Sequence, residues 1–312
     1  MNVPRQRAAR RATARRGMTV IELLVVIMVI VMLVAATIPI MASALEGRKT
    51  REGARLLNQA LADARNRAQE IGRPAGIMIE RHANESRVST TVYPVEVPPP
   101  YSGDLYNSTV QVRVAGGQVT ATVTNAGSFT PQLVHPGDRM QINYQGPIYR
   151  IVSVSAGSIV LDGDVDDDGT SDVDDLPWKD NPSGGLPYVI WRQPERVGGT
   201  PVQLPDGIVI DLSLSSHEAD HDLGDGLEPI VLTFGPSGRP DRIDDGHHEP
   251  EPLVDNLYLL IGKREKRGAE NVNDLANLWV TVGHRTGLIT TAHVTSGDPK
   301  QLARQQHTAG GQ

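Results

Sequence analysis

An acidic loop at residues 164–175 has the spacing of a calcium-binding loop. Acids occupy its positions 1, 3, 5, 9 and 12, glycine occupies position 6 and threonine position 7: Asp164, Asp166, Asp168, Asp172, Asp175, Gly169 and Thr170. Ca²⁺ takes about six to eight oxygen ligands, and glycine at position 6 permits the sharp turn of such loops. Without a cation, so many carboxylates would repel one another. We therefore expect a structural Ca²⁺ here, with a solvated acidic loop as the alternative.

A second candidate is the run His-Glu-Ala-Asp-His at residues 217–221, which has the spacing of a zinc-protease motif. That chemistry requires a helix that presents His217 and His221 on one face, together with a third ligand. The run is short and polar, and Gly224-Asp225-Gly226 follows it, which is typical of a loop. A chance match is the preferred interpretation, and no catalytic residue is predicted.

Glu22 is the single charged residue in the apolar run from Met18 to Ile40. A helix needs roughly 20 apolar residues to cross a bilayer, so the run predicts a transmembrane helix over residues 18–41. The six arginines of residues 1–17 would stay on the cytoplasmic side. A carboxylate in such a span is costly, so Glu22 either has a partner or reaches water at the interface.

The charge distribution limits the classes of partner. The formal net charge is −7, and residues 1–17 contain arginines but no acid, so the remainder is more acidic still. Binding to a nucleic-acid backbone requires a basic face, so no nucleic-acid partner is expected. The chain has no cysteine, which excludes disulfides and thiolate metal sites.

The positioning elements follow from the hydrophobic pattern. Apolar residues recur at spacings of three or four over the predicted amphipathic helix 42–72: Ala54, Leu57, Leu61, Ala64, Ala68 and Ile71. Gly72-Arg73-Pro74 predicts its end, and short strand-like runs separated by Gly and Pro follow. We expect an α+β fold, in which a long N-terminal helix, transmembrane and then amphipathic, packs on an antiparallel β-sheet or β-sandwich domain at 73–294.

Two parts of the chain depart from this scheme. Residues 81–195 contain further short strands, and we expect an inserted β-rich region that forms a small barrel, extends the sheet or decorates a loop. Residues 295–312 lack apolar periodicity, and we expect a disordered tail.

The segment from Arg15 to Ile27 resembles the class III signal of type IV pilins and type II secretion pseudopilins. The resemblance implies that residues 1–17 are a leader, that a prepilin peptidase cuts after Gly17, and that Met18 is then methylated. Glu22 would be the acidic fifth residue of the mature chain, able to neutralise the new amine of a neighbouring subunit. Pro39 falls where pilin helices often carry a proline, which predicts a helix kink.

Further segments resemble the GspH/FimT class of minor pseudopilins and minor pilins. They are the region from Leu57 to Ile79, the run from Leu204 to Asp211, the turn Gly235-Pro-Ser-Gly238 and the hairpin from Val280 to Thr291. This resemblance implies a non-enzymatic minor pseudopilin of a type II secretion system, with a single-pass anchor in the inner membrane and a periplasmic C-terminal domain in the pseudopilus. Its partners would be the prepilin peptidase/N-methyltransferase, other pseudopilins or pilins, the inner-membrane assembly platform and membrane lipid.

Three other functions remain open at the level of the sequence. A minor pilin of a type IV pilus would share the mechanism of Glu22. A membrane-anchored periplasmic metal-binding protein would use His217 and His221 instead. A calcium-dependent adhesin would use residues 164–175.

Overall fold

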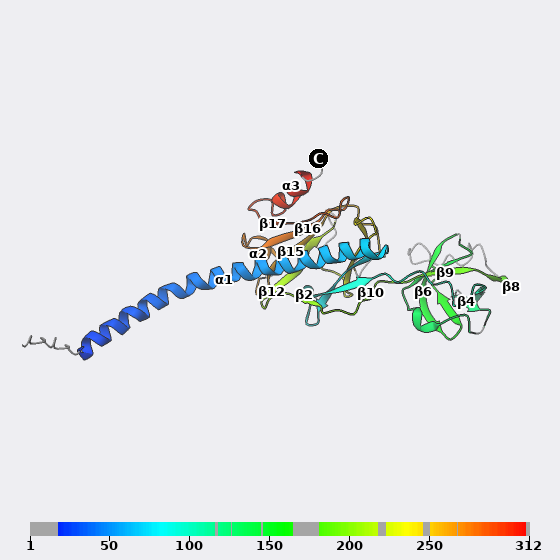
Figure 1. The fold of residues 1–312 in the computed structure, drawn as a ribbon, viewed down its shortest axis with the longest axis horizontal. Helices are drawn as coiled ribbons and strands as arrows, with labels where there is room; N and C mark the ends of the chain where they lie inside the picture. The colour runs from blue at the N-terminus through cyan, green and yellow to red at the C-terminus, as the bar shows by residue number, and fades with distance from the viewer. Residues whose placement is uncertain are drawn as a thin grey trace, which may run out of the picture. The chain divides into compact units, whose positions relative to one another are not determined.

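A long helix, α1, begins the part of the chain that the structure describes (Figure 1). The computed structural model describes residues 18–309 except 116–117, 126, 145, 165–180, 218–222, 246–249 and 267, and describes no side chains at 36–46, 181–183 and 308–309. Helix α1 spans Val20–Ile71 and ends at Gly72, whose φ of 65° favours glycine. The chain divides into two compact units, Met1–Arg48 and Lys49–Gln312.

In the second unit, the apolar stripe of α1 is the buried face of the helix. Ala54, Leu57, Leu61, Ala64 and Ala68 are each at most 6% exposed and belong to one hydrophobic core. The remainder of this core comes from strands of the first sheet. Because the stripe repeats at helical spacing, it turns one side of the helix toward the sheet and leaves the charged side in solvent.

The first sheet has ten strands and is antiparallel throughout its pairings. Its order is β14 (Pro240–Asp244), β13 (Ile230–Phe234), β1 (Ala75–His82), β2 (Glu85–Glu96), β12 (Ile208–Ser216), β15 (Leu257–Lys263), β16 (Leu278–Val282) and β17 (Ile289–His293), while β10 (Glu195–Arg196) and β11 (Val202–Gln203) also pair with β2. Because side chains alternate across a strand, its central strands supply residues to two faces. One face packs on α1, and at the β15–β17 end the other face forms a second core around Trp279.

The second sheet has seven strands and a hydrophobic core of its own. Its order is β8 (Asn181–Leu186), β3 (Val110–Ala115), β4 (Gln118–Val123), β7 (Ser158–Leu161), β6 (Ile148–Ser155), β5 (Arg139–Ile142) and β9 (Tyr188–Trp191), and a 3₁₀ turn, η1, spans Pro131–Leu133. The chain enters and leaves it through one bridged pair. Tyr101 N–H donates to the Ile190 carbonyl at 2.9 Å, and Ile190 N–H donates to the Tyr101 carbonyl at 2.7 Å.

The expected α+β fold, with one long helix packed on a single sheet or sandwich, is therefore wrong. The described chain is mainly β, with two separate sheets, each of which has its own core. Only the part of α1 after Arg48 belongs to the compact unit that contains the sheets. The physical reason is that the buried stripe starts at Ala54, whereas the side chains from Val20 to Val34 are exposed.

The predicted membrane span over residues 18–41 is also contradicted. None of the helices, over the residues that the structure describes, has both the length and the apolar character to cross a membrane. The single-pass inner-membrane location with a periplasmic domain in the pseudopilus, which depended on this span, is corrected with it.

The inserted region is narrower than residues 81–195 and forms a second sheet. Strand β2 lies inside the predicted insertion but pairs with β1 of the first sheet. The second sheet takes residues from Val110 to Trp191. Its core excludes the decorated-loop interpretation, because Tyr149, Met140 and their neighbours are almost completely buried.

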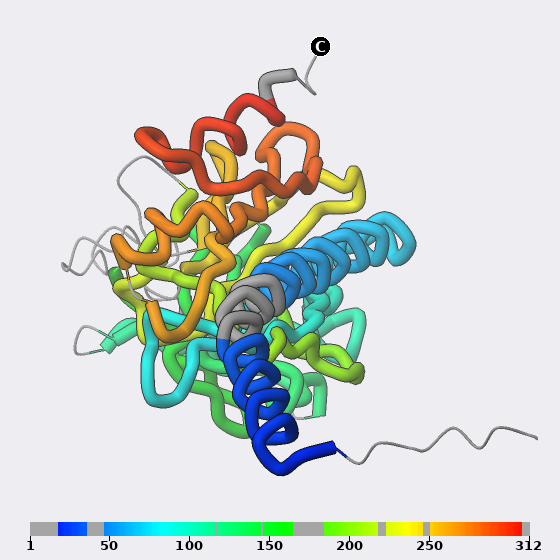
Figure 2. The backbone as a smooth tube through the Cα atoms, turned by 90° about the vertical axis from the view of Figure 1, so that its left-hand side faces the viewer, coloured from blue at the N-terminus to red at the C-terminus, as the bar shows by residue number. Residues whose placement is uncertain are grey.

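The described part of the predicted disordered tail at 295–312, which ends at residue 309, contains a helix. Helix α3 spans Gln301–Ala309, and a short helix, α2, spans Ala269–Val272. Trp279 Nε1 donates to the Pro299 carbonyl at 2.9 Å, and Ala303 is completely buried in the core around Trp279. In Figure 2 the orange strands lie between this red segment and the light-blue part of α1. The indole hydrogen bond, one small apolar residue and polar contacts such as Lys300 Nζ to Ser216 Oγ at 2.6 Å hold the segment, so no apolar period appears in its sequence.

Candidate functional site

The start of α1 positions Glu22 through a helix cap. Thr19 precedes the first helical residue, and its Oγ1 accepts a hydrogen bond from Glu22 N–H at 3.2 Å. The Thr19 carbonyl accepts a second bond, from Leu23 N–H, at 3.1 Å. Thr-x-x-Glu is the sequence of a capping box, and negative charge is favoured in the first turn of a helix. Local geometry therefore fixes Glu22 at the third helical position.

The helix that follows Glu22 exposes apolar side chains on every side. Each residue from Val20 to Val34 other than Glu22 is a large apolar residue, between 40% and 83% exposed. A helix that is apolar all round belongs in the interior of something larger. Exposed apolar surface of this extent marks an interaction site.

The other predicted processing residues differ in what the structure says of them. Met18 is 56% exposed, and Gly17 lies outside the described residues with the rest of the leader. Pro39 lies within α1, which continues through it, and its side chain is outside the described residues. Cleavage after Gly17, methylation of Met18 and the kink at Pro39 stay predictions.

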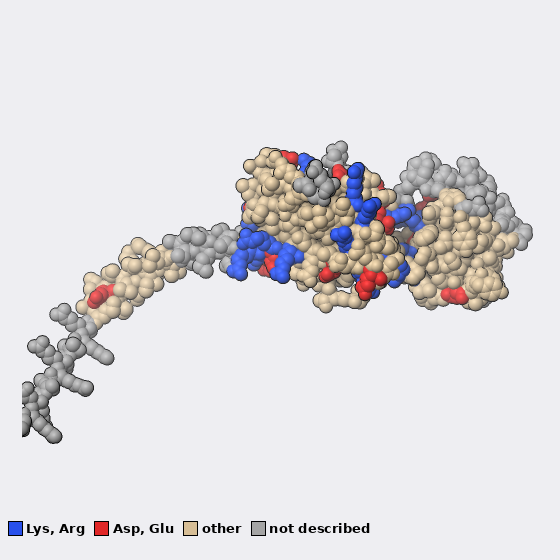
Figure 3. Space-filling view, turned by 45° about the horizontal axis from the view of Figure 1, so that its top comes forward, with Lys and Arg blue, Asp and Glu red and all other residues tan. Residues whose placement is uncertain are grey.

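Basic side chains gather where α1 enters the second unit, as the blue group in Figure 3 shows. Lys49, Arg51 and Arg55 are exposed, opposite the buried stripe. Lys49 Nζ donates to the Asp206 carbonyl at 3.2 Å, and Arg55 lies 3.7 Å from Glu52 across an exposed helical turn. Surface ion pairs of this kind contribute little to stability.

The predicted metal sites are scarcely represented in the described chain. Of the acidic loop, Asp164 is described, whereas Asp166, Asp168, Thr170, Asp172 and Asp175 lie outside the described residues. Within the described ranges no group of three or more His, Asp or Glu side chains is arranged to hold a metal ion. The calcium loop stays a prediction.

His217 does not lie in the helix that a zinc-protease motif requires. It follows the last residue of β12, is 2% exposed, and its Nδ1 lies 3.8 Å from Glu251 Oε1. His221 lies outside the described residues. The strand end at His217 therefore disfavours the arrangement in which both histidines share a helix face.

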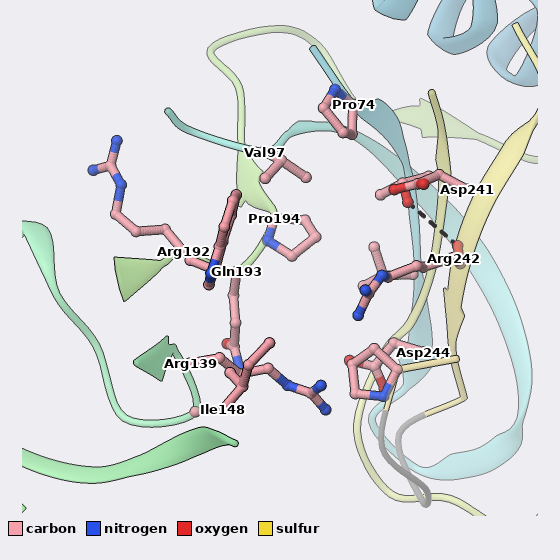
Figure 4. A pocket seen from close by; sticks show the side chains of 15 residues that line it. Pro74, Val97, Arg139, Ile148, Arg192, Gln193, Pro194, Asp241, Arg242 and Asp244 are labelled. Atoms are coloured by element: carbon pink, nitrogen blue, oxygen red, sulfur yellow. Dashed lines mark hydrogen bonds between the residues drawn. The ribbon is translucent and has the colours of Figure 1, made fainter. Parts of the chain in front are cut away.

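The second unit contains a cavity of about 410 Å³ that sequence patterns did not indicate (Figure 4). One wall is the outer face of β9, β5 and β6. Trp191 and Arg139 pair across β9 and β5, so both lie on this face, and Ile148 of β6 also lines the cavity. Trp191 is 47% exposed and Ile148 is 44% exposed.

A buried carboxylate braces this wall. Asp138 is 1% exposed and accepts hydrogen bonds from Gln193 N–H at 2.9 Å and His135 N–H at 2.8 Å. Burial raises the pKa of Asp138, and the two N–H donors oppose the shift. Gly137 also contacts Gln193 closely, because a Cβ at its positive φ of 93° would clash with Gln193 Nε2. The strand exit after Trp191 is thus held in one position.

The opposite wall comes from β13 and β14. Thr233 Oγ1 donates to the Arg242 carbonyl at 3.3 Å, and the side chains of Arg242, Asp241 and Asp244 line the cavity. Ile243 exchanges two backbone hydrogen bonds with Glu251, at 2.8 and 2.9 Å, which fixes β14 from its other edge. Residues far apart in sequence therefore meet here, and only strand pairing could have placed them together.

A buried polar cluster holds the loop between β15 and β16. Asn271 is completely buried, and its Nδ2 donates to Asp211 Oδ2 at 2.8 Å and to the Lys266 carbonyl at 2.8 Å. Its Oδ1 accepts from Lys263 N–H at 3.0 Å. Asn277 donates to the Asn271 carbonyl at 2.8 Å. These bonds satisfy buried polar atoms and serve the fold.

Comparison with models of known families, with characterised proteins and with solved structures finds no match to this chain. The candidate sites therefore rest on the chain's own geometry and on the resemblance of its N-terminal residues.

Proposed function

We propose that the chain is a subunit of a pilin-like filament and assembles through the N-terminal part of α1. One observation carries the proposal: from Val20 to Val34 the helix exposes large apolar side chains all round, interrupted only by Glu22. Such a surface is stabilised when other helices cover it. In a filament, the equivalent helices of neighbouring subunits provide that cover.

Glu22 supplies the register in this proposal. Removal of residues 1–17 would leave a positive amine at Met18. In an apolar surrounding an unpaired charge is heavily penalised, so Glu22 of one subunit and the amine of another are strongly favoured as a pair. A shift of one subunit along the other would leave both charges without a partner. Charge pairing therefore selects one axial position.

A minor pseudopilin of a type II secretion system is the specific role we propose. The segments that resemble the GspH/FimT class contribute to α1 and the first sheet, including β12, β16 and β17. The segment that does not fit that class provides the second sheet. A minor pilin of a type IV pilus is the alternative, since it would use the same helix and the same Glu22.

The first experiment is intact-mass and N-terminal mass spectrometry of the chain from its native host. A chain that begins at N-methylated Met18 supports the proposal and the predicted action of a prepilin peptidase/N-methyltransferase. A chain that retains Arg15 and Arg16, or that begins after Ala44, would overturn it.

A pair of substitutions separates charge pairing from helix capping. Glu22→Gln keeps a side chain that suits a capping box but removes the charge, whereas Glu22→Ala removes both. We expect both variants to be processed and neither to be incorporated into filaments, measured by cross-linking to neighbouring subunits. Glu52→Gln, on an exposed turn of α1, is the matched control and should be incorporated normally. Normal incorporation of Glu22→Gln would exclude charge pairing.

A further inference from the structure

The C-terminal helix α3 covers an aromatic surface of the first sheet through little apolar contact of its own. In Figure 1 it lies beside β16 and β17, against which it packs. Among the described side chains of α3, only Ala303 belongs to the core that contains Tyr258, Leu260 and Trp279, whereas Leu302 is 38% exposed. Because hydrophobic stabilisation scales with the apolar area that is buried, one alanine methyl group holds the helix only weakly.

Polar contacts supply the rest of the attachment, and they leave one polar group unsatisfied. Lys300 Nζ donates to Ser216 Oγ at 2.6 Å and lies 5.2 Å from the ring centres of Tyr258 and Trp279. Thr281 lies two residues after Trp279, on the same face of the sheet, and is completely buried. Its Oγ1 has no hydrogen-bond partner within the described part of the chain. Since a buried hydroxyl without a partner is unfavourable, the covered state is stabilised less than a fully bonded one would be.

His307, in the last turn of α3, contacts the hairpin of β16 and β17 directly. Its Nε2 lies 2.9 Å from Thr290 Oγ1, and the ring also forms a hydrogen bond with the backbone of Thr281. Gly283 leaves room for the ring, because a Cβ at that position would clash with the imidazole. A neutral imidazole satisfies both contacts, since it donates from one nitrogen and accepts at the other.

The surface under the imidazole carries basic residues and no acid. Residues 278–293 form β16, β17 and the turn between them, and they contain no Asp or Glu. Their titratable or charged residues are His284, Arg285 and His293. In the C-terminal segment itself, Asp298 is the one acid from residue 294 to residue 309, and its Oδ2 already accepts a hydrogen bond from Arg304 Nη1 at 2.8 Å. A protonated His307 therefore has no carboxylate of these elements as a counter-ion.

Protonation of His307 consequently opposes the attachment of α3. Burial lowers the pKa of His307, the hydrogen bond with the Thr281 backbone opposes the shift, and the like charge of His284 adds to it. A detached helix would expose the imidazole, whose ordinary pKa is 6.5. Because the attached state binds fewer protons than the detached state, attachment is favoured fully above pH 6.5 and progressively less as the pH falls below that value.

We propose that α3 is an acid-released cover: protonation of His307 detaches it from the hairpin of β16 and β17 and opens the surface around Tyr258 and Trp279 to solvent. The release is local, because the pairings of β15, β16 and β17 do not involve α3. The segment from Val20 to Val34, which carries the proposed filament assembly, takes no part in it.

The test is hydrogen exchange of the full chain, followed by mass spectrometry from about pH 8 to about pH 5 and corrected for the intrinsic effect of pH on exchange. The amides of α3 should exchange faster below pH 6.5, by at most about tenfold for each pH unit, while β15 stays protected. His307→Gln keeps a neutral hydrogen-bonding side chain and should exchange slowly over the whole range. His293→Gln, at the exposed end of β17, is the matched control and should respond as the unchanged chain does.

Thermal unfolding of each variant verifies that the first sheet is intact. Exchange of α3 that does not depend on pH, or a pH response that persists in His307→Gln or disappears in His293→Gln, would overturn the proposal. Fast exchange of His307→Gln at high pH would also overturn it, since the shape of the ring rather than its charge would then hold the helix. Equal acceleration in β15 would indicate unfolding of the sheet instead of release of α3. The experiment requires no filament, so its outcome is separate from that of the proposed function.

Discussion

The two parts of α1 have opposite relations to their surroundings. From Val20 to Val34 the helix is apolar on every side and exposed, whereas from Ala54 to Ala68 one apolar stripe is buried and the other side is charged. The apolar stripe of the second part is buried by strands of the same chain. The apolar side chains of the first part are not buried by any of the described residues. An apolar helix surface of this kind is stable in water only when another molecule covers it. The difference teaches that one part of a single helix stabilises the fold, whereas the other part presents exposed apolar surface.

The strongest test of this comparison is a truncation in each part. Leu61→Ala should lower the free energy of unfolding of the second unit by about 2–5 kcal/mol, because Leu61 is completely buried and its loss leaves a cavity. Leu24→Ala, at a position 61% exposed, should change it by less than about 0.5 kcal/mol. Chemical denaturation measures both changes. Equal changes would show that the two parts of α1 contribute equally to the stability of the fold.

The next effect concerns the buried polar cluster around Asn271 in the second unit. Asn271→Ala should lower the free energy of unfolding by about 1–3 kcal/mol, since it strands the Asp211 carboxylate and the Lys266 carbonyl without their amide donor. Asn66→Ala, at an exposed position of α1, should have almost no effect in the same denaturation experiment. A similar loss in both variants would contradict the structural role of Asn271.

A smaller effect is expected at the exposed end of α1. Thr19→Ala removes the hydroxyl that accepts the Glu22 N–H and should cost about 1 kcal/mol of local helix stability. Hydrogen exchange at the amides of the first turn should become faster, while exchange in the second unit stays unchanged. Slower or equal exchange in the first turn would show that Thr19 does not cap the helix.

The smallest effect is a pH dependence confined to the second unit. Burial raises the pKa of Asp274, but hydrogen bonds from Lys266, Ala276 N–H and Lys263 outweigh it, and the pKa falls from 3.8 to about 2. Since the carboxylate form is favoured in the folded state, its contribution is complete above pH 3.8 and is lost as the pH falls toward 2. Asp274→Asn should flatten the stability profile over this window in acid titrations followed by circular dichroism. An unchanged profile would refute the ion-pair contribution.

The sequence predicts α1 of the second unit well and the second sheet poorly. The stripe from Ala54 to Ala68 is local, so its spacing alone identifies the buried face. Arg139 and Arg242 line the same cavity because of strand pairings between distant segments, and no local pattern of the sequence encodes those pairings. The order of the C-terminal segment depends on Trp279 bonding to the Pro299 carbonyl, which polarity alone cannot reveal.

Because Tyr101 and Ile190 pair with each other, the second sheet is an insertion whose two ends lie together. Its entrance and exit lie side by side, joined by two backbone hydrogen bonds. The first sheet continues directly beyond it, at β10. Because the entropy of closing a loop grows slowly with its length, this position accommodates inserts of very different size. A chain of this architecture can gain, exchange or lose the second sheet without altering α1 or the pairing of the first sheet.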